Sequence, residues 1–174
     1  MGKIKYIKTS ITLYGLIEEN DTLWLEWYNY SKLLTSKLGY NPNYIGVRSE
    51  SFKSGKVITV KRSESKLIKV LESGERPQSL DVYCLHDNFV QAVFDYYTSF
   101  SRIRDFGKHN VTITMPQEKF YEINTDEIIN ELKKYIKFSH GEIYELDYTE
   151  CPILYIYKGK PISKFMNFNL IKEF

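Results

Sequence analysis

The sequence predicts an α+β fold in which helices cover an antiparallel sheet. Apolar residues recur at helical spacing in 21–38 and alternate with polar residues in 5–16. The elements expected up to residue 87 run strand, helix, strand, strand, helix, strand. That order is the ferredoxin-like βαββαβ unit, in which two helices cover one face of an antiparallel sheet. We expect further strands and one helix in the second half.

The elements of the first half follow from short local patterns. Apolar, β-branched runs bounded by turn residues predict strands. A capping serine before an apolar stripe predicts the second helix. The expected strands are 5–16, 44–49, 57–61 and 80–85, and the expected helices are 21–38 and 64–73.

The first helix is the most legible element and carries both tryptophans. Asn20 or Asp21 can cap its start, and Gly39 can end it with a left-handed residue. Trp24 and Tyr28 lie about a quarter-turn from its apolar stripe, so a second apolar surface for a partner is conceivable there. The stripe itself has to face the core and consists of Leu23, Trp27, Tyr30, Leu34 and Leu38.

Residues 89–106 fit two patterns. Their apolar side chains recur at helical spacing, and they alternate equally well as in a strand. Most residues of 89–100 are aromatic or β-branched, which favours a long strand over a helix.

The rest of the chain predicts one helix, three strands and a docked tail. Asn124, followed three residues later by Glu127, has the spacing of a helix cap, so a third helix is expected from there to before His140. Strands are expected at 111–115, 142–148 and 153–158. The tail is apolar, and we expect it to dock on the body through Phe165, Phe168 and Leu170.

Length and composition describe a globular protein. The chain has 174 residues, 43% of them hydrophobic and 26% charged, with a mean hydropathy of -0.39. No linker is visible, so 1–174 is expected to be a single domain, with 1–87 and 88–174 as two tightly packed halves at most. A membrane span and a secretory signal are both unexpected. Cys84 and Cys151 lie in or beside apolar runs, which suggests reduced thiols and a cytoplasmic location.

The sequence predicts no catalytic site, no metal and no cofactor. Cys84, His86 and Asp87 are the residue types of a thiol nucleophile and its base, but adjacency along a strand does not place them in hydrogen-bond geometry. Zinc-ligand spacings are absent, and the glycines form no phosphate-binding loop. We therefore expect a protein that is not an enzyme.

Aromatic content is the most unusual feature, at 16% with 15 tyrosines and 10 phenylalanines. Tyrosine gives apolar contact area at low entropic cost and keeps a hydroxyl, so it is enriched at protein interfaces. A genome rich in A and T would also favour the codons of Tyr, Phe, Ile, Asn and Lys. An interface role and codon usage therefore both stay open as explanations of the high aromatic content.

A small, tyrosine-rich α+β chain without a catalytic constellation resembles the immunity proteins of bacterial contact-dependent and polymorphic toxin systems. The resemblance covers the general plan, including the first helix with LWLEWY and the strand that ends VTITMP. It implies a protein that binds a cognate toxin domain stoichiometrically and blocks its active site or its access to a target.

Two charged stretches are candidate binding surfaces. The acidic stretch is expected to bind the toxin domain and consists of Glu142, Tyr144, Glu145, Asp147, Tyr148 and Glu150. The alternative function is a phage or mobile-element accessory protein that binds nucleic acid or a host defence factor. Its basic stretch consists of Lys53, Lys56, Lys61, Arg62, Lys66 and Lys69. Nucleic acid is the less favoured partner, because the net charge is only +2 and the aromatic-Gly pattern of RNA-stacking strands is missing. An enzyme of another type would need a concave pocket with convergent polar groups.

Overall fold

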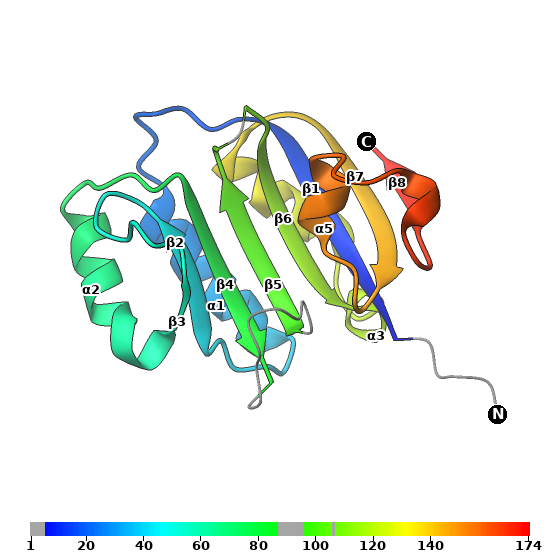
Figure 1. Ribbon diagram of the computed structural model, residues 1–174, viewed down its shortest axis with the longest axis horizontal. Helices are drawn as coiled ribbons and strands as arrows, with labels where there is room; N and C mark the ends of the chain where they lie inside the picture. The colour runs from blue at the N-terminus through cyan, green and yellow to red at the C-terminus, as the bar shows by residue number, and fades with distance from the viewer. Residues whose placement is uncertain (1–5, 87–95, 106) are drawn as a thin grey trace.

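The computed structural model describes residues 6–86, 96–105 and 107–174, which build a mixed α/β structure on one antiparallel sheet (Figure 1). Within these residues, eight strands run in the order β3-β2-β4-β5-β6-β1-β7-β8. The strands are β1 (Ile7–Leu16), β2 (Tyr44–Arg48), β3 (Val57–Thr59), β4 (Ser79–Leu85), β5 (Tyr96–Ile103), β6 (His109–Pro116), β7 (Lys137–Asp147) and β8 (Asn169–Glu173). The helices are α1 (Trp24–Lys37), α2 (Val60–Glu72), α3 (Gln117–Phe120), α4 (Thr125–Leu132) and α5 (Pro152–Ile156), with 3-10 turns η1 (Lys133–Tyr135) and η2 (Ile162–Lys164).

Three helices, α1, α2 and α4, pack on one face of the sheet and enclose the main apolar core. In Figure 1, α1 and α4 lie behind the strands. The strands contribute fully buried side chains such as Ile11, Phe100 and Ile113 to the same cluster. Because side chains alternate along a strand, the apolar half of each central strand faces these helices. No helix in the described ranges is long and apolar enough to cross a membrane.

The opposite face of the central strands is polar yet buried, and we call it the hydroxyl face. It consists of Ser10, Thr12, Ser99, Ser101, Thr112 and Thr114, all buried. Thr12 Oγ1 is 3.0 Å from Thr112 Oγ1 and 2.9 Å from the Tyr144 hydroxyl. The short helix α5 covers this face, where Figure 1 shows it in front of the sheet, and Ile156 is buried against it. Four of these hydroxyls therefore hydrogen-bond in pairs across β1 and β6, Ser10 with Thr114 and Thr12 with Thr112, away from water.

The strand order does not confirm a ferredoxin-like first half. The elements β1, α1, β2, β3, α2 and β4 do follow the expected order along the chain. However, β4 pairs with β5, and β1 pairs with β6 and β7. The hairpin of β5 and β6 therefore lies between β4 and β1, and the sheet joins strands from both halves of the chain.

The buried side of α1 includes Trp27, Leu34 and Leu38, as predicted, and extends beyond the expected stripe. Trp24 and Tyr28, expected to lie beside the stripe, are buried, whereas Tyr30 is only half-buried. Trp24 packs under the buried guanidinium of Arg102, whose carbon lies 4.3 Å from the ring centroid. The Tyr28 hydroxyl donates to Glu64 at 2.9 Å. The conceivable second partner surface is not present at these two residues, because both are buried in the core.

The strand expected at 153–158 is also wrong, since this segment contains α5. Pro152 occupies the first helical positions, where its missing N–H costs no hydrogen bond and its fixed φ suits a helix. Apolar residues in so short a run do not separate strand from helix, so the proline was the more informative signal.

The remaining expectations hold in part. The predicted cap is confirmed, because Glu127 N donates to Asn124 Oδ1 at 3.2 Å. The strand preferred for 89–100 is found from Tyr96 onward as β5, and 89–95 lies outside the described residues. In the tail, Phe165 is buried and Phe168 half-buried, whereas Leu170 is 41% exposed.

Candidate functional site

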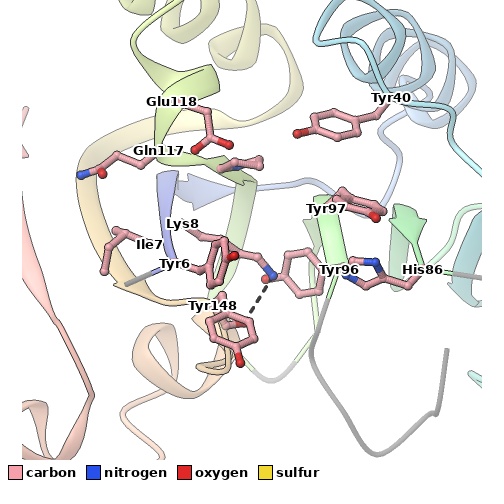
Figure 2. Close-up of a pocket in the computed structure, with 11 residues that line it drawn as sticks. Tyr6, Ile7, Lys8, Tyr40, His86, Tyr96, Tyr97, Gln117, Glu118 and Tyr148 are labelled. Atoms are coloured by element: carbon pink, nitrogen blue, oxygen red, sulfur yellow. Dashed lines mark hydrogen bonds between the residues drawn. The ribbon is translucent and has the colours of Figure 1, made fainter. Parts of the chain in front are cut away.

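A cleft of about 660 Å³ opens at one end of the sheet, and we call it the tyrosine cleft (Figure 2). The antiparallel topology brings the starts of β1 and β5 and the ends of β6 and β7 to this end. Tyrosines from four distant segments line it, namely Tyr6, Tyr40, Tyr96, Tyr97 and Tyr148. The strand order therefore gathers side chains that the sequence keeps far apart.

The tyrosine rings hold one another in place. Tyr40 stacks on Tyr97 with ring centroids 5.4 Å apart. On the other side, Tyr6 meets Tyr148 edge-on at 5.7 Å. Tyr6 and Tyr97 are still 61% and 39% exposed. These rings present apolar area and hydroxyls to solvent with few rotamers left to lose on binding.

The floor of the cleft is a buried cation. Lys8 is only 6% exposed, and its ammonium lies 3.8 Å from the centroid of the Tyr96 ring. The same ammonium donates to the carbonyl oxygen of Tyr148 at 3.3 Å, which Figure 2 marks with a dashed line. Lys8 therefore links the Tyr96 ring to the backbone of Tyr148 and holds the two together at the floor of the cleft.

The wall opposite Lys8 is acidic. Figure 2 shows the Glu118 carboxylate and the Tyr40 hydroxyl facing each other across the top of the cleft. Burial, and next the charge of Glu118, raises the pKa of Tyr40. The Tyr40 hydroxyl therefore keeps its proton at neutral pH and can both donate and accept a hydrogen bond.

The polar groups of the cleft suit recognition better than the thiol chemistry considered from the sequence. His86 lines the cleft and packs on Tyr97 at 4.0 Å between ring centroids. Cys84 is buried and does not line it, and Asp87 lies outside the described residues. Among the described residues, no group of three His, Cys, Asp or Glu side chains could hold a metal ion.

The acidic stretch lies on β7 and the turn after it, and β7 is an inner strand between β1 and β8. Its carboxylates accept hydrogen bonds from within the protein. Glu145 accepts from Gln117 at 2.6 Å and from Asn169 at 3.2 Å, and Glu150 accepts from Lys160 at 2.7 Å. Tyr144 is fully buried. Of the six predicted residues, Tyr148 is the one that lines the tyrosine cleft.

Two further carboxylates of this stretch are held in the same way. Glu142 accepts hydrogen bonds from the hydroxyls of Tyr14 at 2.9 Å and Tyr155 at 3.1 Å. Burial alone would raise the pKa of Asp147, but hydrogen bonds from Thr149 and Asn167 hold it below its usual value. The six residues adjoin along the chain, but they form no common exposed patch.

The basic stretch lies at the other side of the sheet, on the loop before β3 and on α2. All six of its side chains are exposed, namely Lys53, Lys56, Lys61, Arg62, Lys66 and Lys69. Lys66 bridges the two segments, because its ammonium donates to the Ser51 carbonyl at 3.0 Å and lies 4.4 Å from the Phe52 ring centroid. The stretch is therefore one continuous basic surface.

Sequence reasoning missed Tyr6, Tyr40 and Tyr97 as site residues. Each lies within three residues of the end of a strand or helix. Residues this close to the end of a strand or helix lie near loops, where binding residues are common, so their position is the signal that could have found them. Which ends meet depends on the strand order, and no local pattern carries that order.

No protein-family model, curated protein or solved structure gives a significant match to this chain.

Proposed function

We propose that this chain is a non-catalytic protein that binds and neutralises a cognate toxin domain, and that the tyrosine cleft is where it binds. The observation that carries the proposal is the convergence of preorganised, part-exposed tyrosines on one concave surface. Tyrosine is enriched at the energetic centres of protein interfaces, where aromatic anchors occupy desolvated pockets. A cytoplasmic location is part of the proposal, since the two cysteines are buried and too few to build a disulfide framework.

The charges of the cleft indicate the contact that the partner makes. Glu118 is exposed at the rim, whereas Lys8 is buried in the floor. An arginine of the partner that enters between the tyrosine rings would stack on them and pair with Glu118. The proposal therefore favours a toxin domain with a basic side chain at the surface that is blocked.

Co-expression with the protein encoded by the neighbouring upstream gene, which this proposal expects to carry a toxin domain, tests this function. The intact chain should restore growth of cells that make the toxin, and the two proteins should co-elute in equal amounts. A double variant, Tyr6→Ala with Tyr97→Ala, should lose the rescue. Tyr121→Ala is the matched control, because Tyr121 is 70% exposed and lies outside the cleft. Rescue by the double variant at the level of the intact chain would contradict the proposed site.

The acidic stretch stays a prediction as the rival binding surface. Asp147 is one of its two half-buried carboxylates. Asp147→Lys should leave the rescue intact if the tyrosine cleft binds the toxin, and should abolish it if the acidic stretch does.

The alternative function, an accessory protein that binds nucleic acid or a host defence factor, is favoured by the exposed basic surface on α2. Replacing Lys53, Lys66 and Lys69 by glutamine tests it. If generic RNA or DNA binds in a salt-sensitive manner, and these changes remove the binding, the alternative is the better assignment.

A further inference from the structure

A bulge between β1 and β7 shapes the surface at the opposite end of β1 from the tyrosine cleft. The pairing shifts between Tyr14 and Gly15, which face His140 and Phe138 respectively, so Ser139 is the extra residue. A Cβ on Gly15 would lie 2.0 Å from the Lys137 carbonyl oxygen, so only glycine permits this approach. Bulges of this kind redirect side chains.

Two hollows open beside the bulge, and Tyr14, Lys108 and His140 line both of them. The His140 ring stacks on Tyr14 with centroids 4.7 Å apart, and the Lys108 ammonium lies 5.0 Å from the Tyr14 ring. One hollow, of about 510 Å³, includes Lys137, and the other, of about 680 Å³, includes Lys158. Because the hollows share Tyr14, Lys108 and His140, they adjoin, and we call the two together the basic groove.

The basic groove carries an excess of unpaired positive charge. In the described part of the chain, its three lysines 108, 137 and 158 form no ion pair with a carboxylate. Lys160 also lines the groove, but its charge is neutralised by Glu150 at 2.7 Å. Glu142 is the single carboxylate among the lining residues, and two tyrosine hydroxyls donate to it. An anion is therefore the complementary ligand.

Lys158 has a backbone conformation that a glycine would adopt more easily. Its φ is 53°, in the left-handed region, and it follows Tyr157, the residue that caps the C-terminal end of α5. The N–H of Lys158 bonds to the Tyr155 carbonyl at 3.2 Å, and the N–H of Gly159 bonds to the Leu154 carbonyl at 2.8 Å. This helix-ending motif usually places glycine where Lys158 stands. The lysine is thus kept at a position where its backbone is disfavoured, which is typical of functional sites.

We propose that the basic groove binds single-stranded nucleic acid. The ammoniums of Lys108, Lys137 and Lys158 hold neighbouring phosphates, and a base stacks on the exposed ring of His140, which Tyr14 supports from behind. Lysines combined with an aromatic ring are the usual platform for single strands, whereas an acidic peptide would leave the ring without a stacking partner. This activity is separate from the proposed toxin binding, because the groove and the tyrosine cleft share no lining residue.

Fluorescence anisotropy of the full chain with labelled oligo(U) and oligo(dT) of about eight nucleotides tests the proposal. Three phosphate contacts predict a slope of about -2 for the logarithm of the association constant against that of the salt concentration. Lys158→Gly should weaken binding about fivefold at about 0.1 M salt and make the slope less steep by about 0.7. Its melting temperature should hold or rise, because glycine relieves the left-handed strain. His140→Ala should weaken binding at least about fivefold through lost stacking.

Two controls make the test decisive. Lys164→Ala removes an exposed charge from the same tail outside the groove, so it should leave the affinity unchanged. Polyglutamate of about ten residues should compete poorly with the oligonucleotides, because it has charge but no base. No measurable binding, equal weakening by Lys158→Gly and Lys164→Ala, or equal competition by polyglutamate would each overturn the proposal. Failure of toxin binding would not affect this result, since it is measured at the other end of the sheet.

Discussion

The two faces of the sheet are both buried, but they are buried by different chemistry. The face under α1, α2 and α4 is an apolar core with Trp27 at its centre. The hydroxyl face under α5 consists of serine and threonine side chains that hydrogen-bond one another. The comparison teaches that alternation along a strand shows which side chains share a face, but not whether the polar face meets water.

The helix-covered face should be the more sensitive to truncation. Trp27 is fully buried, its Nε1 donates to the Leu80 carbonyl at 3.2 Å, and its ring packs edge-on against Tyr135 at 5.3 Å. Trp27→Ala should lower the free energy of unfolding by about 3–5 kcal/mol, measured by urea denaturation. Leu33→Ala, on the same helix but 54% exposed, should change it by less than about 0.5 kcal/mol. A loss under about 1 kcal/mol at Trp27 would contradict the assignment of the core.

The hydroxyl side of the sheet should respond to pH, because it holds an ionisable group. Burial raises the pKa of Asp81 from 3.8 to about 6, although hydrogen bonds with Ser101 and Tyr83 lower it. The folded state thus binds the Asp81 proton more tightly than the unfolded state. The contribution of Asp81 to the free energy of unfolding is therefore most favourable below about pH 4, and it declines as the pH rises to about 6.

The variant Asp81→Asn tests whether ionisation of Asp81 makes the stability of the hydroxyl face depend on pH. The variant should be more stable than the parent at pH 7 by about 1–3 kcal/mol, and the difference should vanish toward pH 4. Asp81 is only half-buried, so the lower end of that range is expected. Urea denaturation of both proteins between about pH 4 and 7 checks it. A constant difference across this range would mean that Asp81 ionises as it does in the unfolded chain.

Single hydroxyls on the hydroxyl face should matter least. Tyr144→Phe removes one hydrogen bond to Thr12 and should cost about 1 kcal/mol of unfolding free energy. Thr12→Val removes the bonds to both Tyr144 and Thr112 and should cost about 2 kcal/mol. Equal and negligible losses, measured by thermal melting, would show that water reaches this face.

The elements that could be predicted from the sequence are those that depend on residues close together in the chain. Alternation in β1, the cap at Asn124 and the helical spacing in α1 each involve residues close in sequence, and each predicted its element. The sequence did not show that α1 also buries Trp24 and Tyr28, because their partners Arg102 and Glu64 are remote in sequence.

The site was less predictable than the fold, for a related reason. The tyrosine content did not show which tyrosines come together, because Tyr6, Tyr40 and Tyr97 meet only through the placement of the β5–β6 hairpin between β4 and β1. The acidic stretch was conspicuous in sequence, but its carboxylates bond to donors such as Gln117 from other elements. Charge clustering along a chain does not show which charges are already satisfied.

Calorimetric titration of the chain with the toxin domain that the proposal expects as its partner tests the central claim most directly. Combining Tyr6→Ala with Tyr97→Ala should raise the dissociation constant at least about 100-fold, because truncating two aromatic anchors at the centre of an interface costs more than about 3 kcal/mol. Tyr121→Ala should leave the constant within about twofold. An unchanged dissociation constant in the double variant, with its melting temperature preserved, would contradict the assignment of the tyrosine cleft as the binding surface.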